Sequence, residues 1–223
     1  MSWQNITAPL TAVALDQLPG EIAPKNSTAI FIPFSLISDP ASVALIIIGQ
    51  DPYYTPRLAT GLAFGIPQDC NKVPPSLKNI LAKYGLGDPT LEKWAKKGVL
   101  LINSALTVEI GKPNSHSKYW RVPVRKTLQN LVDYSQQKGQ RLHFVLWGRK
   151  AIELHSQLCT SMSLHTCCCS SHPSPLACRK QVMNYPPFIQ HCEIPDCPCK
   201  TLYSTAERAS ETSPSDCCAS SNI

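Results

Sequence analysis

Four short apolar runs are spaced along the chain, and each has the length of a β-strand. The first, Val43–Ile48, is continuous and rich in β-branched residues, and it is bounded by Asp39-Pro40 and Gly49, which is typical of a strand buried on both faces. Three further strands are predicted at Val99–Asn103, Leu142–Trp147 and about Met162–Cys167. No run approaches the roughly 20 apolar residues that span a bilayer, so we expect no contact with a membrane.

Segments with helical periodicity separate these runs. Ser76 is predicted to cap a helix that continues to about Tyr84. Apolar residues at helical spacing predict a second helix over 124–132, with Gly139 as its stop signal, and a short helix is expected to end near Leu158. Strands that alternate with helices predict an α/β fold: a single domain with a central four-stranded parallel sheet and helices on both faces.

The two ends of the chain differ from this pattern. We expect the α/β domain to cover residues 1–203, of which 1–40 form a proline-punctuated, weakly periodic and divergent N-terminal segment. Residues 204–223 contain eight Ser or Thr and no apolar pattern, so we expect a disordered tail.

Polar residues follow each predicted strand. Gly49-Gln50-Asp51 comes after the first strand, and the second ends at Asn103. Gly148-Arg149 follows the third strand, and the fourth is followed by a segment that begins Ser171-His172. Ligands of parallel sheets bind beyond the carboxyl ends of the strands. A carboxylate, a carboxamide, a glycine turn and an imidazole are therefore expected to converge on one edge, which is a catalytic site in outline.

The charge of the chain is unevenly distributed. Of its 223 residues, 21 are Lys or Arg and 15 are Asp or Glu, for a net charge of +6. Residues 70–150 carry 15 basic and four acidic groups, a net of +11, whereas 1–69 and 151–223 are net acidic. Such a block indicates either solvated helix faces or a surface that neutralises phosphates, and charge alone leaves both interpretations open.

Cysteine content and the N-terminus bear on the compartment. The sequence has eleven cysteines but begins with neither a basic nor an apolar leader segment, so we expect a soluble intracellular protein with reduced thiols. Cys192, Cys197 and Cys199 do not have the spacing of a CxxC…CxxC site, and we predict no metal.

Six segments, in order over about residues 43–177, resemble family 1 uracil-DNA glycosylase. The family's water-activating loop is matched by Gly-Gln-Asp-Pro-Tyr-Tyr at 49–54, and its uracil-stacking segment by Gly-Leu-Ala-Phe at 61–64. Its proline-rich loop, uracil-recognition strand, phosphate-contacting turn and intercalation loop are matched at 73–79, 94–103, 146–148 and 172–176. Each segment alone is weakly specific, but the ordered set is highly specific.

The resemblance implies hydrolysis of the N-glycosidic bond of flipped-out uracil, in single- or double-stranded DNA, which releases uracil and leaves an abasic site. Asp51 would stabilise the sugar cation and orient the attacking water, and His172 would donate a hydrogen bond to uracil O2. Four residues would bind the base: Gln50 in the catalytic loop, Asn103 on O4 and N3–H, Phe64 by stacking, and Tyr53 in the space of thymine's methyl group.

The resemblance also implies a DNA-binding surface. Leu176 would wedge into the stack vacated by the flipped base, on a loop stiffened by Pro175, while other residues contact phosphates. These are Ser76, Gly148 and Ser174, and Pro74 and Pro75 belong to the loop that compresses the DNA backbone. Arg149 is expected as a further phosphate contact from its charge and position alone. The expected partners are uracil-containing DNA and, among proteins, a glycosylase inhibitor or a replication partner. We expect a monomer that needs no cofactor and acts in the nucleus or another genome-containing compartment.

The sequence departs from the family at one loop position and leaves rivals open. Tyr54 stands where the family usually has His, which puts the rate of catalysis in question more than the specificity.

The compact chain would suit a DNA virus. The main alternative is a glycosylase-like DNA-binding or replication scaffold with weak catalysis. An iron–sulfur glycosylase would need N-terminal cysteines, and a Ser hydrolase a Gly-x-Ser-x-Gly elbow; the sequence has neither.

Overall fold

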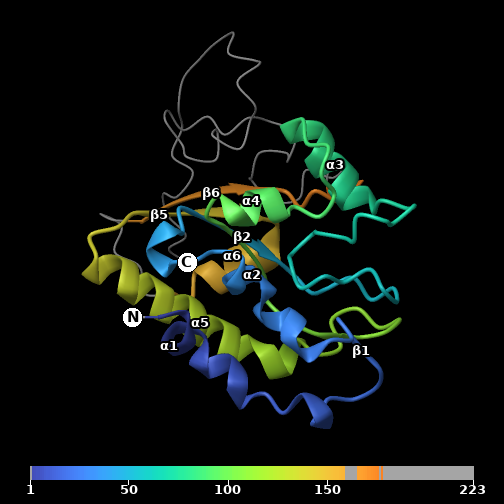
Figure 1. Cartoon of the computed structure of the whole chain (residues 1–223), viewed down its shortest axis with the longest axis horizontal. Coiled ribbons are helices and arrows are strands. Elements are labelled where there is room, and N and C mark those ends of the chain that lie inside the picture. The colour runs from blue at the N-terminus through green and yellow to red at the C-terminus, as the bar shows by residue number, and fades with distance from the viewer. Residues whose placement is uncertain (1, 159–164, 176, 178–223) are drawn as a thin grey trace, which may run out of the picture.

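The chain forms one parallel sheet of four strands. The computed structural model describes residues 2–158, 165–175 and 177 (Figure 1). The strand order is β3-β2-β5-β6, and all neighbours are parallel. The strands are β2 (Leu45–Gly49), β3 (Val99–Asn103), β5 (Leu142–Trp147) and β6 (His165–Ser170). The predicted α/β class with a single four-stranded parallel sheet is confirmed.

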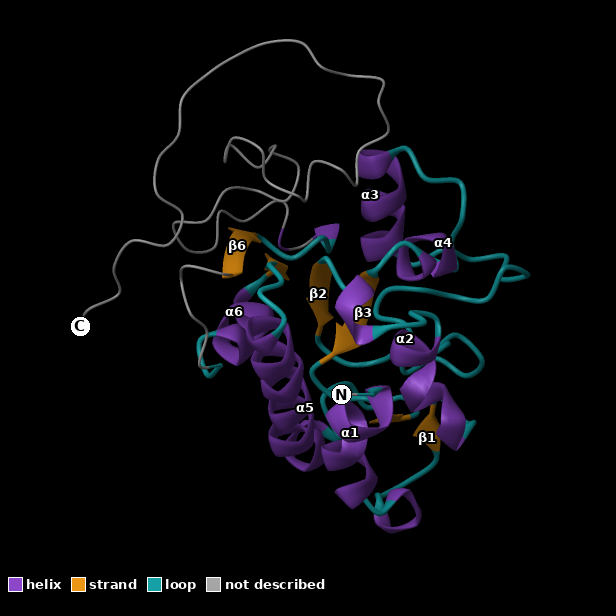
Figure 2. Ribbon diagram, turned by 60° about the vertical axis from the view of Figure 1, so that its left-hand side comes forward, coloured by secondary structure: helices purple, strands orange, loops and turns teal. Residues whose placement is uncertain are grey.

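Both faces of the sheet are covered by helices, as predicted. In β2, Ile46 and Ile48 face one core, whereas Leu45 and Ile47 face the other, because side chains alternate along a strand. The two helical layers lie on opposite sides of the sheet (Figure 2). One layer contains α1 (Trp3–Thr7), α5 (Ser117–Gln137) and α6 (Arg149–His155), and the other contains α3 (Pro75–Tyr84) and α4 (Glu92–Lys96).

Two strands have different ends from those predicted. β2 begins at Leu45 and not at Val43, because the Val43 N–H donates to Pro40 O and closes a 3-10 turn, η4 (Pro40–Ser42). β6 runs to Ser170 and not to Cys167, because all six of its described residues pair with β5. Residues 162–164 of the predicted strand lie outside the described residues.

Three helices also differ from the prediction, and one of them, α6, ends at His155 and not near Leu158. Ser76 does not cap α3: Pro74 is the N-cap residue, and Pro75 opens the helix, where its missing N–H costs nothing. α5 begins at Ser117, well before residue 124, and continues through Pro123. Among the described helices, none is long and apolar enough to cross a bilayer.

The N-terminal segment contains more structure than its weak periodicity predicted. Its short elements are α1, η1 (Ala8–Ala12), η2 (Leu15–Gln17), β1 (Ile22–Ala23), η3 (Ser27–Phe31) and α2 (Ile32–Ser35). β1 pairs antiparallel with β4 (Val108–Glu109), a second small sheet that was not predicted. Ile6, Ile30 and Phe34 enter the core beside α5. The segment therefore packs against the same core as the sheet.

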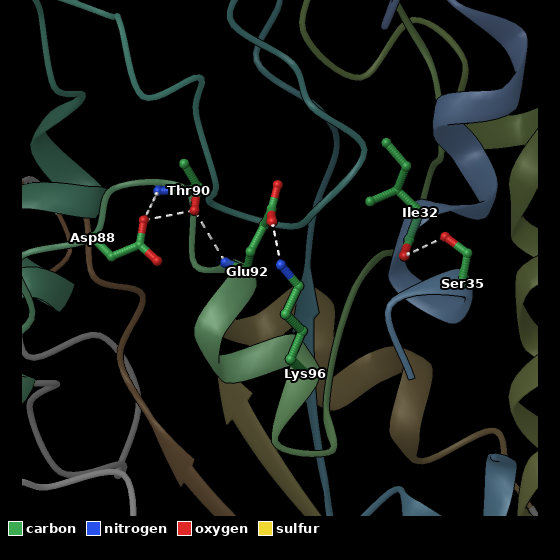
Figure 3. A network of polar contacts seen from close by, with 6 residues as sticks. All are labelled: Ile32, Ser35, Asp88, Thr90, Glu92 and Lys96. Carbon is green, nitrogen blue, oxygen red and sulfur yellow. Dashed lines mark hydrogen bonds and ion pairs between the residues drawn. The ribbon is translucent and has the colours of Figure 1, made fainter. Parts of the chain in front are cut away.

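α4 is a further element that the sequence reading missed, and polar contacts define its start (Figure 3). The Asp88 carboxylate accepts hydrogen bonds from the Thr90 N–H and hydroxyl, at 3.0 and 2.6 Å. The Thr90 hydroxyl in turn accepts the Glu92 N–H at 3.2 Å, and Glu92 pairs with Lys96 one turn later. The Thr90 hydroxyl thus satisfies one backbone N–H in the first turn of a helix that is only five residues long.

Candidate active site at the carboxyl edge of the sheet

Asp51 lies two residues beyond β2, on a turn that is joined to the end of β3. The Ser104 N–H donates to Gly49 O, and both the Ala105 N–H and the Ser104 hydroxyl donate to Gln50 O, at 3.0 and 2.6 Å. β2 is central, and the chain leaves its carboxyl end toward α3, whereas it leaves the neighbouring β5 toward α6 on the other face. Such a switch point opens a ligand crevice in parallel sheets.

The Asp51 carboxylate is half-buried and held by two donors. Its Oδ2 accepts the backbone N–H of Asn114 at 2.7 Å, and its Oδ1 accepts Nε2 of Gln50 at 3.4 Å. Burial raises the pKa of Asp51 above its ordinary value, and the contacts with Asn114 and Gln50 oppose that rise. The carboxylate is thus partly removed from water, and the two donors hold it in a defined orientation.

Asn114 is a site residue that the sequence reading missed. Its side-chain Oδ1 accepts Nε2 of Gln50 at 2.6 Å, and its backbone has a positive φ of 64°. Asn tolerates this left-handed conformation better than other residues except Gly, and a Pro-Asn pair in a loop is a turn signal. The sequence could have revealed the turn, but not its contact with a carboxylate 63 positions earlier.

Asn103 is brought beside this turn by strand register. It is the last residue of β3, pairs with Gly49 of β2, and is only 3% exposed. A Cβ atom at Gly49 would collide with the Asn103 carboxamide oxygen, so glycine is required for the two strand ends to approach. The structure therefore places Asn103 next to the Gln50-Asp51 turn, as the strand ends predicted.

Phe64 connects the Asp51 loop to the end of β5 and to the loop after β6. The hydroxyl of Tyr53 donates to Phe64 O at 3.1 Å, and burial raises the pKa of Tyr53, so that this hydroxyl stays protonated. The Phe64 ring lies 5.4 Å from Trp147 at the end of β5 and 5.8 Å from His172 beyond β6. Phe64 has a φ of 66°, a backbone state that such a residue keeps only where its surroundings hold it.

His172 is oriented by its own loop. Its Nδ1 accepts the Ser174 N–H at 3.1 Å, so the neutral imidazole carries its proton on Nε2. Burial lowers the pKa of His172, which favours this neutral form. Gly148 has a φ of 88°, and a Cβ there would lie 3.0 Å from that of His172. The glycine turn after β5 thus leaves room for the imidazole.

Most of the described residues predicted to bind DNA lie at the start of α3 and on the loop after β6, which contact each other, whereas Gly148 and Arg149 lie at the turn between β5 and α6. Pro74, Pro75 and Ser76 begin α3, and the Asn79 side chain in that helix donates to Pro173 O at 2.7 Å. The Ser174 carbonyl accepts the Ala177 N–H at 3.1 Å in a turn that includes exposed Pro175. Leu176 lies outside the described residues. Asn79, whose side chain joins the loops, was not among the predicted site residues.

Two other residues singled out from the sequence, Arg149 and Tyr54, are exposed in the structure. Arg149, at the start of α6, lies 3.5 Å from the Glu153 carboxylate in an exposed ion pair, which a phosphate could replace at small cost. Tyr54 is 46% exposed, and its carbonyl accepts the Gly111 N–H.

Within the described part of the chain, no three His, Cys, Asp or Glu residues gather as metal ligands, and residues 192–199 lie outside it.

The fold and this edge define a doubly wound α/β protein with polar side chains clustered at its strand ends. The model of the Uracil DNA glycosylase superfamily matches residues 37–193, and the chain belongs to that superfamily. The resemblance drawn from the six sequence segments is therefore confirmed.

Two curated relatives illustrate the similarity. A uracil-DNA glycosylase of Bordetella pertussis is 38% identical over 155 residues, which cover 67% of this chain and 59% of that protein. One of Coxiella burnetii (strain CbuG_Q212) is 43% identical over 148 residues, covering 61% of this chain and 60% of the relative. The chain thus spans about three fifths of the length of these relatives.

Solved structures show the same likeness. The mimivirus uracil-DNA glycosylase superposes with a TM-score of 0.63 at 27% identity, covering 77% of this chain and 63% of that one. A mimivirus UNG variant in complex with UGI gives a TM-score of 0.66 at 26% identity, covering 85% and 74%.

Proposed function

We propose that this protein is a uracil-DNA glycosylase, which hydrolyses the N-glycosidic bond of flipped-out uracil in single- and double-stranded DNA. One observation carries the proposal: the chain belongs to this superfamily, and Asp51, Asn103 and His172 all lie at the carboxyl edge of its sheet. The products are free uracil and an abasic site, as in base excision repair.

The roles of Asp51 and His172 follow from the charges that bond cleavage creates. The sugar becomes cationic and the base anionic, so catalysis requires a group of opposite charge or polarity beside each. Asp51, ionised and held by two donors, stabilises the sugar cation and orients the attacking water. His172, neutral with its proton on Nε2, donates to uracil O2 as negative charge develops there.

Selection of uracil rests on four residues around the base. The buried Asn103 carboxamide offers one donor and one acceptor, which match O4 and N3–H of uracil but not cytosine. Phe64 stacks on the base, and its ring is held near Trp147 and His172. Tyr53, fixed by its bond to Phe64 O, occupies the space that a thymine methyl would need. Gln50 completes this group beside Asp51.

DNA binding is assigned to the two loops that meet at Asn79. Pro74, Pro75 and Ser76 on one side, and Ser174 and Pro175 on the other, contact backbone phosphates together with Gly148 and Arg149. The net charge of +11 over residues 70–150 supports this surface. Leu176 supplies the wedge after base flipping, which costs a few kcal/mol.

The protein acts on its own as a monomer and without a cofactor, in a compartment that contains a genome. A structural neighbour is a complex with UGI, which supports a proteinaceous inhibitor as a second partner. A replication protein is a third proposed partner.

The decisive test is an incubation with a uracil-containing oligonucleotide in the presence of chelator, followed by detection of abasic sites. We expect release of free uracil from single and double strands, and none from thymine or cytosine controls. Binding to DNA without cleavage, even at high protein concentration, would instead support the DNA-binding scaffold.

A further inference from the structure

Asn114 contacts two of the proposed site residues through different atoms. Its backbone N–H donates to Oδ2 of Asp51 at 2.7 Å, and its side-chain Oδ1 accepts Nε2 of Gln50 at 2.6 Å. The same Gln50 amide lies 3.4 Å from the other carboxylate oxygen of Asp51. Asp51, Gln50 and Asn114 therefore form a closed triangle of hydrogen bonds at the end of β2.

The loop that carries Asn114 is anchored at several points, so its tip has a defined position. The Gly111 N–H donates to Tyr54 O at 3.0 Å, which joins this loop to the Asp51 loop a second time. The Ser115 hydroxyl accepts the Glu109 N–H at 2.8 Å. Asn114 lies between these anchors, with the left-handed backbone that points its N–H at the carboxylate.

A buried chain of hydrogen bonds fixes the end of the loop. The indole N–H of Trp120 donates to Thr107 Oγ1 at 2.7 Å, and the Thr107 hydroxyl donates to Nδ1 of His116 at 2.9 Å. His116, which is fully buried, then donates from Nε2 to Pro19 O at 3.0 Å. An indole N–H can only donate and a carbonyl can only accept, so His116 carries a hydrogen on Nε2; in the tautomer with that one ring hydrogen, Nδ1 is the acceptor.

We propose that Asn114 is a positioning residue for the reaction, which holds the Asp51 carboxylate and the Gln50 amide in one arrangement beneath the substrate. This inference rests on the proposed glycosylase function. The Asn114 backbone N–H orients the carboxylate, and its side chain prevents the Gln50 amide from rotating away. A half-buried carboxylate without such donors would have several orientations, of which only one faces the sugar cation.

Two substitutions separate the backbone contact from the side-chain contact. Asn114→Gly keeps the N–H and allows the left-handed φ, but it removes the acceptor for Gln50. We expect kcat on single-stranded DNA to fall about three- to tenfold, the effect of one ordinary hydrogen bond, with DNA affinity within about twofold. Asn114→Asp keeps an acceptor but adds a negative charge near Asp51, and this charge favours protonation of Asp51.

For Asn114→Asp we therefore expect the acidic limb of the kcat profile to move to higher pH by roughly one unit, the change produced by a neighbouring like charge. A ¹³C NMR titration of the Asp51 carboxyl should move in the same direction, and it can be followed without catalysis. Gln137→Glu, an exposed position at the end of α5, makes the same charge change and should leave both measurements as in the wild type.

The proposal is overturned if Asn114→Gly keeps wild-type kcat, or if the Asp51 titration of Asn114→Asp coincides with that of Gln137→Glu. A purely structural role would lower the melting temperature of both variants without moving the titration. If the wild type releases no uracil, the proposed function fails, whereas the titration still tests the contact between Asn114 and Asp51.

Discussion

Burial has opposite effects in two adjoining regions, the interior of the sheet and the loops at its carboxyl edge. Inside, β2 and β3 are buried along their whole length, and their apolar side chains fill the cores on both faces. At the edge, two residues beyond β2, burial raises the pKa of Asp51 and so disfavours the charged form. Burial stabilises the fold in the first region and opposes folding in the second, where the chemistry is proposed.

The largest expected effect is on catalysis. Asp51→Asn should lower kcat about 10³-fold, because electrostatic stabilisation of the transition state is lost, and DNA binding should remain nearly intact. Abasic-site formation in single-turnover assays measures the first quantity, and fluorescence anisotropy the second. Asp69→Asn removes the same charge from an exposed loop and should leave kcat unchanged. A large loss of DNA affinity in Asp51→Asn would show that Asp51 binds DNA instead of catalysing.

The same variant tests the stability side of the comparison. Because the Asp51 pKa is raised in the folded protein, its protonation stabilises the fold at low pH, and this contribution is lost as pH rises through the folded pKa. At neutral pH, Asp51→Asn should therefore melt at a higher temperature than the wild type. The difference should shrink as pH falls below the ordinary range of Asp. An unchanged or lower melting temperature at neutral pH would refute this relation.

The next effect is on stability alone. Ile47→Ala removes a fully buried side chain from the core beside α3 and α4, and it should cost about 2–5 kcal/mol of unfolding free energy. Activity per folded molecule should stay close to that of the wild type. Chemical denaturation and active-site titration measure the two quantities. Val122→Ala, at a position 48% exposed on α5, should change the unfolding free energy by less than about 0.5 kcal/mol.

A smaller effect is expected where the two regions meet. Gly148→Ala places a Cβ 3.0 Å from that of His172 and should displace the imidazole, lowering kcat about tenfold. Gly139→Ala is a matched control, since Gly139 has a similar positive φ of 62° but no atom within 4 Å of the added Cβ. Both variants should lose stability, and only the first should lose activity per folded molecule. Equal losses of activity would contradict the steric argument.

The smallest effect concerns the contact between the two loops that are proposed to bind DNA. Asn79→Ala removes the hydrogen bond to Pro173 O. The rate of duplex DNA cleavage should fall a few-fold, which corresponds to the loss of about one hydrogen bond. Single-stranded substrates, which need no wedge to expel the base, should be affected less. Kinetics on matched single- and double-stranded oligonucleotides give the ratio, with exposed Asn71→Ala as the control. Equal losses on both substrates would contradict a role in presenting the loop.

The sequence predicted regular, strongly patterned elements better than short ones. β3 and β5 have the predicted ends, since a strand buried on both faces appears as an uninterrupted apolar run. α4 and the β1–β4 pair were missed, because elements of two to five residues depend on side-chain caps and distant partners. The end of β6 was misplaced because its cysteines lack a clear strand pattern, and pairing with β5 decides where it stops.

By itself, the sequence determined the fold class, the family and the residues that follow each strand, because apolar periodicity and ordered motifs are local properties of the chain. Only the tertiary structure decided that Asn114 reaches Asp51, that Asn79 joins the two loops proposed to bind DNA, and that Gly148 leaves room for His172. These contacts join residues 24 to 94 positions apart, and they depend on strand register and backbone conformation. The basic charge is likewise placed by the tertiary structure. Residues 70–150, with a net charge of +11 in a chain of net +6, include both the start of α3 and the loop beside Asp51.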